Sequence, residues 1–205
     1  MLTILIKTNG EPNVTQLTYE NLWREIKDIK DAEIMIVNDW REAIPEVRTK
    51  LVACVESDCL VNSGYFKSMV GFLSKRQYGA VAMLSSSVGV NQWGNRFYGY
   101  QVVNSNVKGI IPNQSKHSSS LYPVQIGYFP GALFRTDVLE SLDEWDNNLV
   151  LLSAKISFDI WKRDLLVYVN PNTTYVTTEE YVNDITDYDV ESKELLEKFK
   201  REAIV

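Results

Sequence analysis

Two carboxylates, Glu56 and Asp58, follow a short apolar run at residues 51–55 and have one residue between them. The length and β-branched content of this run predict a buried strand rather than a helix. Ligands of open α/β sheets bind beyond the carboxyl ends of the strands, and side chains two apart on an extended chain point the same way. The pair therefore predicts a site for a divalent cation, magnesium or manganese, which can itself hold a diphosphate. The alternative is a polar strand end before a turn at residues 62–64.

The composition limits the class of protein. The chain has 205 residues, of which 45% are hydrophobic and 23% charged, so we expect one globular domain with a sizeable core. Its net charge of -6 does not indicate a large nucleic-acid-binding surface, which normally needs a basic stripe. A local basic groove is compatible with this net charge. No run is long and apolar enough for a membrane span, and the first residues lack a basic leader.

The two cysteines, Cys54 and Cys59, are five residues apart around the predicted strand end. Such a pair fits a reducing compartment rather than a disulfide framework, so we expect a cytoplasmic location. Cys59 is expected to be a small buried hydrophobe and not a catalytic thiol, because the single histidine, His117, falls in a distant polar loop.

Strand and helix patterns alternate through the first 84 residues. Apolar β-rich runs predict strands, and apolar stripes at helical spacing predict helices. The predicted strands are residues 3–6, 33–37, 51–55 and 80–84, and the predicted helices are residues 19–29 and 65–73. Short crossovers of this kind predict an α/β fold with a parallel sheet that has helices on its faces.

The second half has a different pattern. Residues 85–122 are polar, and residues 113–120 are of low complexity and predict a loop. The later part predicts two short helices, the first with Thr136 as its N-cap. A strand that ends at a Pro-containing turn and a charged C-terminal helix follow. These elements are residues 136–142, 156–162, 165–169 and 191–204.

Taken in order, several segments resemble the family 2 glycosyltransferases of GT-A fold, which use nucleotide-diphosphate sugars. The matching segments are residues 4–12, 34–39, 55–61, 128–139, 145–149 and 167–171. The resemblance implies a GT-A-like three-layer sandwich, with a mostly parallel central sheet and helices on both faces. It also implies a single catalytic domain of residues 1–205, in which 1–84 form the nucleotide-binding half, 85–176 the acceptor-side half and 177–205 a C-terminal tail and helix.

The resemblance further implies a metal-assisted glycosyltransferase with a nucleotide-diphosphate sugar donor and an unidentified acceptor. Glu56 and Asp58 would bind the manganese or magnesium ion, Asp58 more directly. Asn38 or Asp39 would contact the nucleobase. The alternative role for Asp39 is that of an acid in the turn that follows a strand. Gly131 would let the acceptor approach closely. The implied donor-binding residues are Thr8, Asn9, Asn38, Asp39, Ser57 and Gly131.

The catalytic base has two alternative positions in this resemblance. Counting forward from Asp146 places the family's acid pair on residues 153–154, Ser-Ala, which cannot act as a base. Counting back from Trp161 places Asp159 in that role, and we take Asp159 as the predicted base; the alternative is a helix acid paired with a nearby basic residue. The first alternative predicts a catalytically degenerate nucleotide-sugar-binding or interaction module on the same fold. Nucleotidyl transfer is a further enzyme alternative.

Overall fold

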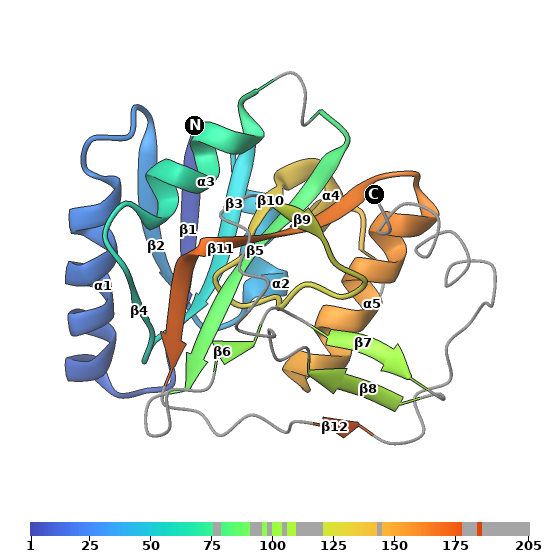
Figure 1. Ribbon diagram of the computed structural model, residues 1–205. Helices are drawn as coiled ribbons and strands as arrows, with labels where there is room; N and C mark the ends of the chain where they lie inside the picture. The colour runs from blue at the N-terminus through green and yellow to red at the C-terminus, as the bar shows by residue number, and fades with distance from the viewer. Residues whose placement is uncertain are drawn as a thin grey trace.

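The structure is a computed structural model (Figure 1), which describes residues 1–75, 79–90, 96–97, 100–103, 106–109, 121–142, 145–177 and 184–185. The predicted loop at residues 113–120, the histidine within it and the predicted C-terminal helix at residues 191–204 lie outside these ranges. Within them, no helix is long and apolar enough to cross a membrane.

Three parallel strands form the first half of the large sheet. They are β1 (Leu2–Lys7), β2 (Ala32–Val37) and β3 (Leu51–Glu56), and they confirm the first three strands predicted from apolar runs. β1 lies between the other two, so that Lys7 pairs with both Val37 and Glu56. The three strands therefore end at the same edge of the sheet, which we call the carboxyl edge; the opposite edge is the amino edge.

The second half makes the sheet mixed rather than parallel throughout. β10 (Leu133–Arg135) is antiparallel to β3 on one side and to β5 (Val81–Val90) on the other. β11 (Leu166–Thr177) is parallel to β5, and β4 (Leu60–Val61) pairs antiparallel with β11. The strand order is β2-β1-β3-β10-β5-β11-β4, with β6 (Arg96–Phe97) beside β5 and β9 (Tyr122–Pro123) beside β11. A second, small sheet contains β7 (Tyr100–Val103), β8 (Asn106–Gly109) and β12 (Asp184–Ile185).

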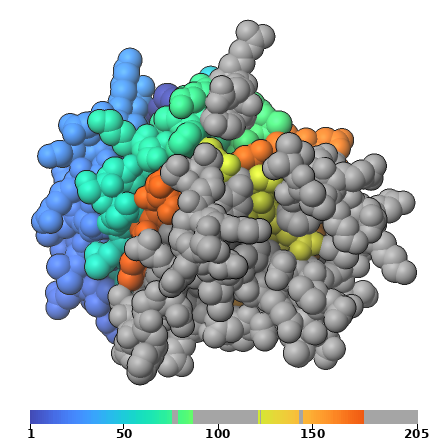
Figure 2. All heavy atoms as spheres, in the orientation of Figure 1, coloured from blue at the N-terminus to red at the C-terminus, as the bar shows by residue number. Residues whose placement is uncertain are grey.

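Helices pack on both faces of the large sheet because the strand residues alternate between two apolar cores. Ile4 and Ile6 of β1 belong to one core and Leu5 to the other. The first core includes residues of α1 (Pro12–Ile26) and α3 (Tyr65–Leu73). The second includes residues of α2 (Trp40–Ala43), the 3₁₀ helix η1 (Ile44–Glu46), α4 (Thr136–Glu140) and α5 (Leu149–Lys162). In Figure 2, α1 and α3 form the blue and green outer surface on the left of the molecule.

Two helices start earlier than their apolar stripes predict. α1 begins at Pro12, seven residues before the predicted start at residue 19, because proline fits the first turn of a helix. α5 begins at Leu149 instead of residue 156, since the Asn148 side chain accepts hydrogen bonds from the N–H groups of residues 150 and 151. The prediction of Thr136 as an N-cap was wrong: the cap residue of α4 is Arg135.

The last core strand is longer than predicted. The sequence places its end at residues 170–172, yet β11 continues to Thr177. Its pairing with β5 is irregular between Asn170 and Thr174, so Pro171 lies in a bulge where the missing N–H breaks no ladder hydrogen bond. The continuation brings Tyr175 beside Val61 of β4. The sheet therefore curls, and its far strand lies close to the residues that follow β3.

Candidate functional site

The carboxyl edge collects most of the residues that the sequence predicts to be functional. Because β1, β2 and β3 are in register, the residues after each strand lie at the same edge. Thr8 and Asn9 follow β1, Asn38 and Asp39 follow β2, and Ser57 and Asp58 follow β3. These residues surround the strand end that carries Glu56, as the location of ligand sites in α/β sheets leads one to expect.

Glu56 and Asp58 are both half-buried at the end of β3. The thiol of Cys59 lies within electrostatic range of both carboxylates. Burial raises the pKa of Cys59 above its ordinary value, the two carboxylates raise it further, and a hydrogen bond with Tyr175 partly opposes them. The raised pKa keeps the thiol protonated and unreactive, and Cys54 and Cys59 are both free and buried, as expected for structural cysteines.

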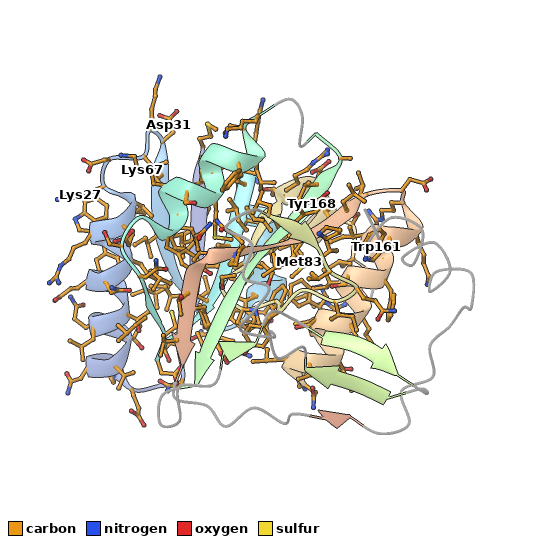
Figure 3. All side chains as sticks on the ribbon, in the orientation of Figure 1. Lys27, Asp31, Lys67, Met83, Trp161 and Tyr168 are labelled. Atoms are coloured by element: carbon orange, nitrogen blue, oxygen red, sulfur yellow. The ribbon has the colours of Figure 1, made fainter. Side chains whose placement is uncertain are left out.

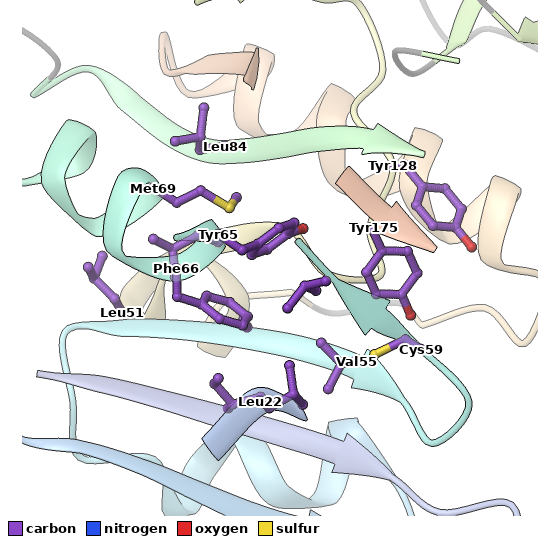
Figure 4. Packing of buried hydrophobic residues seen from close by; sticks show 14 of the residues in the cluster. Leu22, Leu51, Val55, Cys59, Tyr65, Phe66, Met69, Leu84, Tyr128 and Tyr175 are labelled. Atoms are coloured by element: carbon purple, nitrogen blue, oxygen red, sulfur yellow. The ribbon is translucent and has the colours of Figure 1, made fainter. Parts of the chain in front are cut away.

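Tyr175 of β11 is fully buried and contacts the carboxylate segment directly. Its hydroxyl oxygen accepts a hydrogen bond of 3.3 Å from the backbone N–H of Glu56. In Figure 4, the Tyr175 side chain points toward Val55, at the end of β3, and toward Cys59 in the segment that follows it. A contact across 119 residues of sequence thus helps to fix the backbone at the candidate metal ligands.

Gly131 performs a packing role that the sequence does not reveal. Its φ of 75° lies in the left-handed region, its N–H donates to the Cys54 carbonyl at 2.7 Å, and its own carbonyl accepts from the Tyr65 hydroxyl at 2.8 Å. A Cβ at this position would lie 2.3 Å from the Tyr175 ring. The space beside Gly131 is therefore filled by the protein's own tyrosine, and its absent side chain makes room for Tyr175.

Helix α1 holds the segment after β3 through polar side chains on one of its faces. The Thr18 hydroxyl lies 2.5 Å from the carbonyl oxygen of Ser57 and 3.1 Å from that of Cys59. Asn21 accepts a hydrogen bond from the Val61 N–H at 3.0 Å. Glu25 accepts hydrogen bonds from the first N–H groups of α3, at residues 64 and 65. Ser57 takes part in this anchor through its backbone carbonyl, and at 2% exposed it is not part of an open surface.

The loop after β1 is closed by its own side chains. The Thr8 hydroxyl accepts a hydrogen bond from the Gly10 N–H at 3.2 Å and lies 3.4 Å from the Thr15 hydroxyl. The Asn9 side chain accepts from the Glu11 N–H at 3.0 Å. These short-range bonds shape the loop that leads into α1, and Asn9 stays exposed at the carboxyl edge.

The loop after β2 has both a structural role and exposed polar groups. One Asp39 carboxylate oxygen accepts a hydrogen bond from the Arg41 N–H at 2.7 Å and so caps α2. Asp39 thus has the structural role, an acid in the turn after a strand, that the sequence offers as the alternative to nucleobase contact. Asn38 is exposed. The adjoining Trp40 is buried, and its indole N–H donates to the carbonyl oxygen of Leu5 at 3.1 Å.

Lys7 is a residue of this edge that the sequence analysis missed. It is the last residue of β1, it is half-buried, and its ammonium lies 5.2 Å from the centre of the Trp40 ring. A single lysine at a predicted strand end gives no distinctive pattern. Only the parallel register of β1 and β3, which pairs Lys7 with Glu56, shows that a lysine is the strand neighbour of this carboxylate.

Asp159 is not brought together with Glu56 and Asp58. It lies in the last turns of α5, where its carboxylate pairs with the Arg163 guanidinium at 2.6 Å. Arg163 also contacts Ser141, which follows α4. The last residue of β10 pairs with the first residue of β3, and α4 follows it directly, so α4 starts at the amino edge. The ion pair of Asp159 and Arg163, which contacts the end of α4, therefore lies toward the amino edge. The surroundings of Asp159 are those of the alternative to a catalytic base, a helix acid paired with a nearby basic residue.

The alternative register places a buried serine in the first half of α5. The Ser153 hydroxyl donates to the Leu149 carbonyl at 2.6 Å and accepts from the Phe129 N–H at 2.9 Å. The nearby Asp146 pairs with Lys155 at 3.1 Å. Burial opposes ionisation of Asp146, but hydrogen bonds from the Asn148 N–H and from Lys155 outweigh it and lower its pKa. A carboxylate with a lowered pKa is a weak base at neutral pH.

Among the described residues, no three His, Cys, Asp or Glu side chains are grouped closely enough to form a metal site by themselves. Glu56 and Asp58 would therefore supply two ligands, and any others would come from substrate, water or residues outside the described ranges. Carboxylate oxygens suit magnesium and manganese, and magnesium is commonly held by one or two carboxylates together with substrate phosphates. The pair thus fits the type of cation that the sequence predicts.

Comparison with known proteins identifies the fold. No protein-family model and no curated protein sequence matches this chain. Its structure is similar to that of GalNAc-T7 with UDP, GalNAc and Mn²⁺, with a TM-score of 0.65 and 9% sequence identity over 89% of this chain. It is also similar to S. aureus TarS with UDP-GlcNAc, with a TM-score of 0.56 and 11% identity over 88% of this chain. A third similar structure is A197 from STIV, with a TM-score of 0.52 and 9% identity over 88% of this chain.

These neighbours show that the chain has the GT-A fold, as the ordered sequence segments predict. The chain spans 44% of the GalNAc-T7 chain and 59% of the TarS chain, but 87% of the A197 chain. At sequence identities of 9 to 11%, the similarity establishes the fold and leaves activity to be argued from the site.

Proposed function

We propose that this protein transfers a sugar from a nucleotide-diphosphate donor to an acceptor, with a divalent cation held at the carboxyl edge. The observation that carries the proposal is the half-buried pair Glu56 and Asp58 at the end of the central strand β3 of a GT-A fold. The neighbours GalNAc-T7 and TarS contain UDP and UDP-GlcNAc, respectively, which makes UDP-sugars the first donors to test.

The two carboxylates would hold the cation against the donor's diphosphate. Bound there, the cation would supply charge neutralisation for the diphosphate as it leaves. The protein's own contribution is to fix the ligands: Tyr175 holds the N–H of Glu56, and Thr18 holds the carbonyl groups on both sides of Asp58. Such fixed positions lower the cost of arranging ligands when a substrate binds.

The nucleoside would lie across the ends of β1 and β2. Asn38 offers both a hydrogen-bond donor and an acceptor for a nucleobase edge, and Asp39 would use the carboxylate oxygen that does not cap α2. Thr8 and Asn9 would border the same space from the loop before α1. The ammonium of Lys7, held over Trp40, adds positive charge close to where the diphosphate would lie.

A catalytically degenerate sugar-nucleotide-binding module is the second candidate, and one observation favours it. The predicted base Asp159 is paired with Arg163 toward the amino edge, and the alternative register places Ser153 where the acid would be. Transfer with inversion needs a general base at the acceptor hydroxyl. Donor binding without transfer is therefore the function expected if no base comes from residues outside the described ranges.

Calorimetric titration with UDP-GlcNAc and UDP-GalNAc in the presence of manganese separates these functions. Cation-dependent binding together with release of UDP, detected by a coupled assay with a panel of acceptors, supports the transferase. Saturable binding without UDP release or acceptor modification supports the binding module. Absence of binding to any nucleotide-diphosphate sugar, with manganese present, would refute both.

A further inference from the structure

A cavity of about 800 Å³ lies at the amino edge, at the end of the sheet opposite Glu56 and Asp58. It forms where β10, with three residues, lies between the longer strands β3 and β5. The first residues of those strands, Leu51 and Val81, line it together with Leu73 at the end of α3. A volume of this size is in the range of small-molecule sites in proteins.

The floor of this amino-edge cavity is apolar. Val47, Leu51 and Val81 are 3%, 7% and 3% exposed, respectively. Val47 belongs to the second core and Leu51 to the first, so these buried side chains present a fixed surface. An apolar floor of this kind favours the apolar part of a ligand, because its contact with water is removed on binding.

The rim of the cavity is predominantly cationic. It carries Arg48, Lys50 and Arg135 against Asp137 and Glu140, in a protein whose net charge is -6. A positive rim in a negatively charged protein favours anions over the cations that the rest of the surface attracts.

Of these three cationic side chains, two are held by the protein and the third is not. Arg135 binds Asp137 at 2.9 Å and the carbonyl oxygen of Gly79 at 3.3 Å. Arg48 donates to the carbonyl oxygen of Pro45 at 2.8 Å. The ammonium of Lys50 has no hydrogen bond or ion pair with any residue that the structure describes, although its carbonyl oxygen is bound by the backbone N–H of residue 136. Lys50 is thus a cation on a fixed backbone without an internal counter-charge.

We propose that the amino-edge cavity is a second binding site, for a small organic anion with an apolar body. The apolar body lies on Val47, Leu51 and Val81, and the carboxylate, sulfonate or phosphate of the ligand pairs with Lys50, with Arg48 beside it. This site is independent of the sugar-nucleotide function proposed above, because it uses none of the residues of the carboxyl edge.

Anilinonaphthalene sulfonate is a suitable probe, since it combines an apolar body with one sulfonate and fluoresces when bound. Phenylnaphthylamine, which lacks the sulfonate, measures the apolar contribution alone. We expect saturable binding of the sulfonate at one site, with affinity reduced about tenfold in Lys50→Glu, the loss expected for one charged contact. The affinity for phenylnaphthylamine should be the same in both proteins.

Lys27→Glu is the matched control. Lys27 is exposed, follows α1 and does not line the cavity, yet its substitution changes the net charge equally (Figure 3). Equal sulfonate affinity in Lys50→Glu and Lys27→Glu would overturn the proposal. Displacement of the sulfonate by UDP to the same extent in wild type and Lys50→Glu would also overturn it, because the probe would then occupy a site that does not involve Lys50. Thermal unfolding followed by circular dichroism confirms that both variants are folded.

Discussion

The hydroxyl oxygen of Tyr175 accepts a hydrogen bond of 3.3 Å from the backbone N–H of Glu56, although β10 and β5 lie between their strands in the sheet. The contact exists because β4, which follows the carboxylate segment directly, pairs with β11 at Tyr175. The curled sheet therefore positions the candidate metal ligands from two sides, through β3 itself and through its most distant parallel strand.

The Tyr175 hydroxyl should contribute measurably to stability. Tyr175→Phe keeps the ring but leaves the Glu56 N–H without this acceptor in a part-buried environment, at an expected cost of about 1 kcal/mol in the free energy of unfolding. Urea denaturation of the variant measures this cost. Tyr19→Phe, at a half-buried position on α1, is the control and should stay within about 0.5 kcal/mol of wild type. Equal stability of both variants would mean that the Tyr175 hydroxyl has no structural role.

Gly131 should not tolerate a side chain. Gly131→Ala places a Cβ 2.3 Å from the Tyr175 ring on a backbone with φ of 75°, so we expect a loss of about 2 to 4 kcal/mol in stability. Gly71→Ala is the matched control, since no heavy atom lies within 4 Å of its added Cβ and the position is helical. That variant should be more stable by about 0.5 to 1 kcal/mol. Thermal and urea unfolding measure both effects, and a fully stable Gly131→Ala would contradict the packing described here.

The ion pair of Asp146 and Lys155 should make stability depend on pH. The folded protein lowers the pKa of Asp146, so the pair adds stability above the ordinary aspartate pKa of about 3.9. This contribution is lost as the pH falls through the lowered value. Wild type should exceed Asp146→Asn by about 0.5 kcal/mol near neutral pH, because the pair is partly exposed to solvent.

Urea unfolding at a series of pH values tests this dependence. The difference between wild type and Asp146→Asn should shrink as the pH is lowered from about 6 to about 3. Lys155→Met should show the same convergence, since it removes the other partner. A difference that stays constant over this range would show that Asp146 is not responsible for it.

Asp159 should not control turnover if its surroundings are those of a helix ion pair. Asp159→Asn removes the partner of Arg163, and because the two side chains are 31% and 35% exposed we expect a loss below about 1 kcal/mol in stability. Any UDP release by the wild-type protein should persist in the variant. A large drop in turnover with unchanged donor affinity would instead establish Asp159 as the base that the sequence register predicts.

The strands around the site are predictable from the sequence because their signals are local. The apolar runs at β1, β2 and β3 and the acids after β3 are sufficient to place Glu56 and Asp58 at the carboxyl edge. The end of β11 was predicted wrongly, since a bulge between Asn170 and Thr174 admits a proline that ends most strands.

The remaining features of the site depend on contacts between distant parts of the chain. Gly131 gives a turn-like signal, but its contact with Tyr175 arises from pairing of β4 with β11. The anchoring role of Thr18 requires α1 to lie against the residues after β3. Asp159 was placed by counting residues in a helix, and spacing alone does not say which end of the helix lies nearest the site.

Calorimetric titration of UDP-GlcNAc into wild type and Asp58→Asn, with and without manganese, tests the central claim most directly. We predict that wild-type binding requires manganese and that Asp58→Asn loses at least about tenfold in affinity, as expected when a charged ligand becomes neutral. The exposed Asp28→Asn should bind as wild type does. Equal, manganese-independent affinity in all three proteins would contradict a cation site at Glu56 and Asp58.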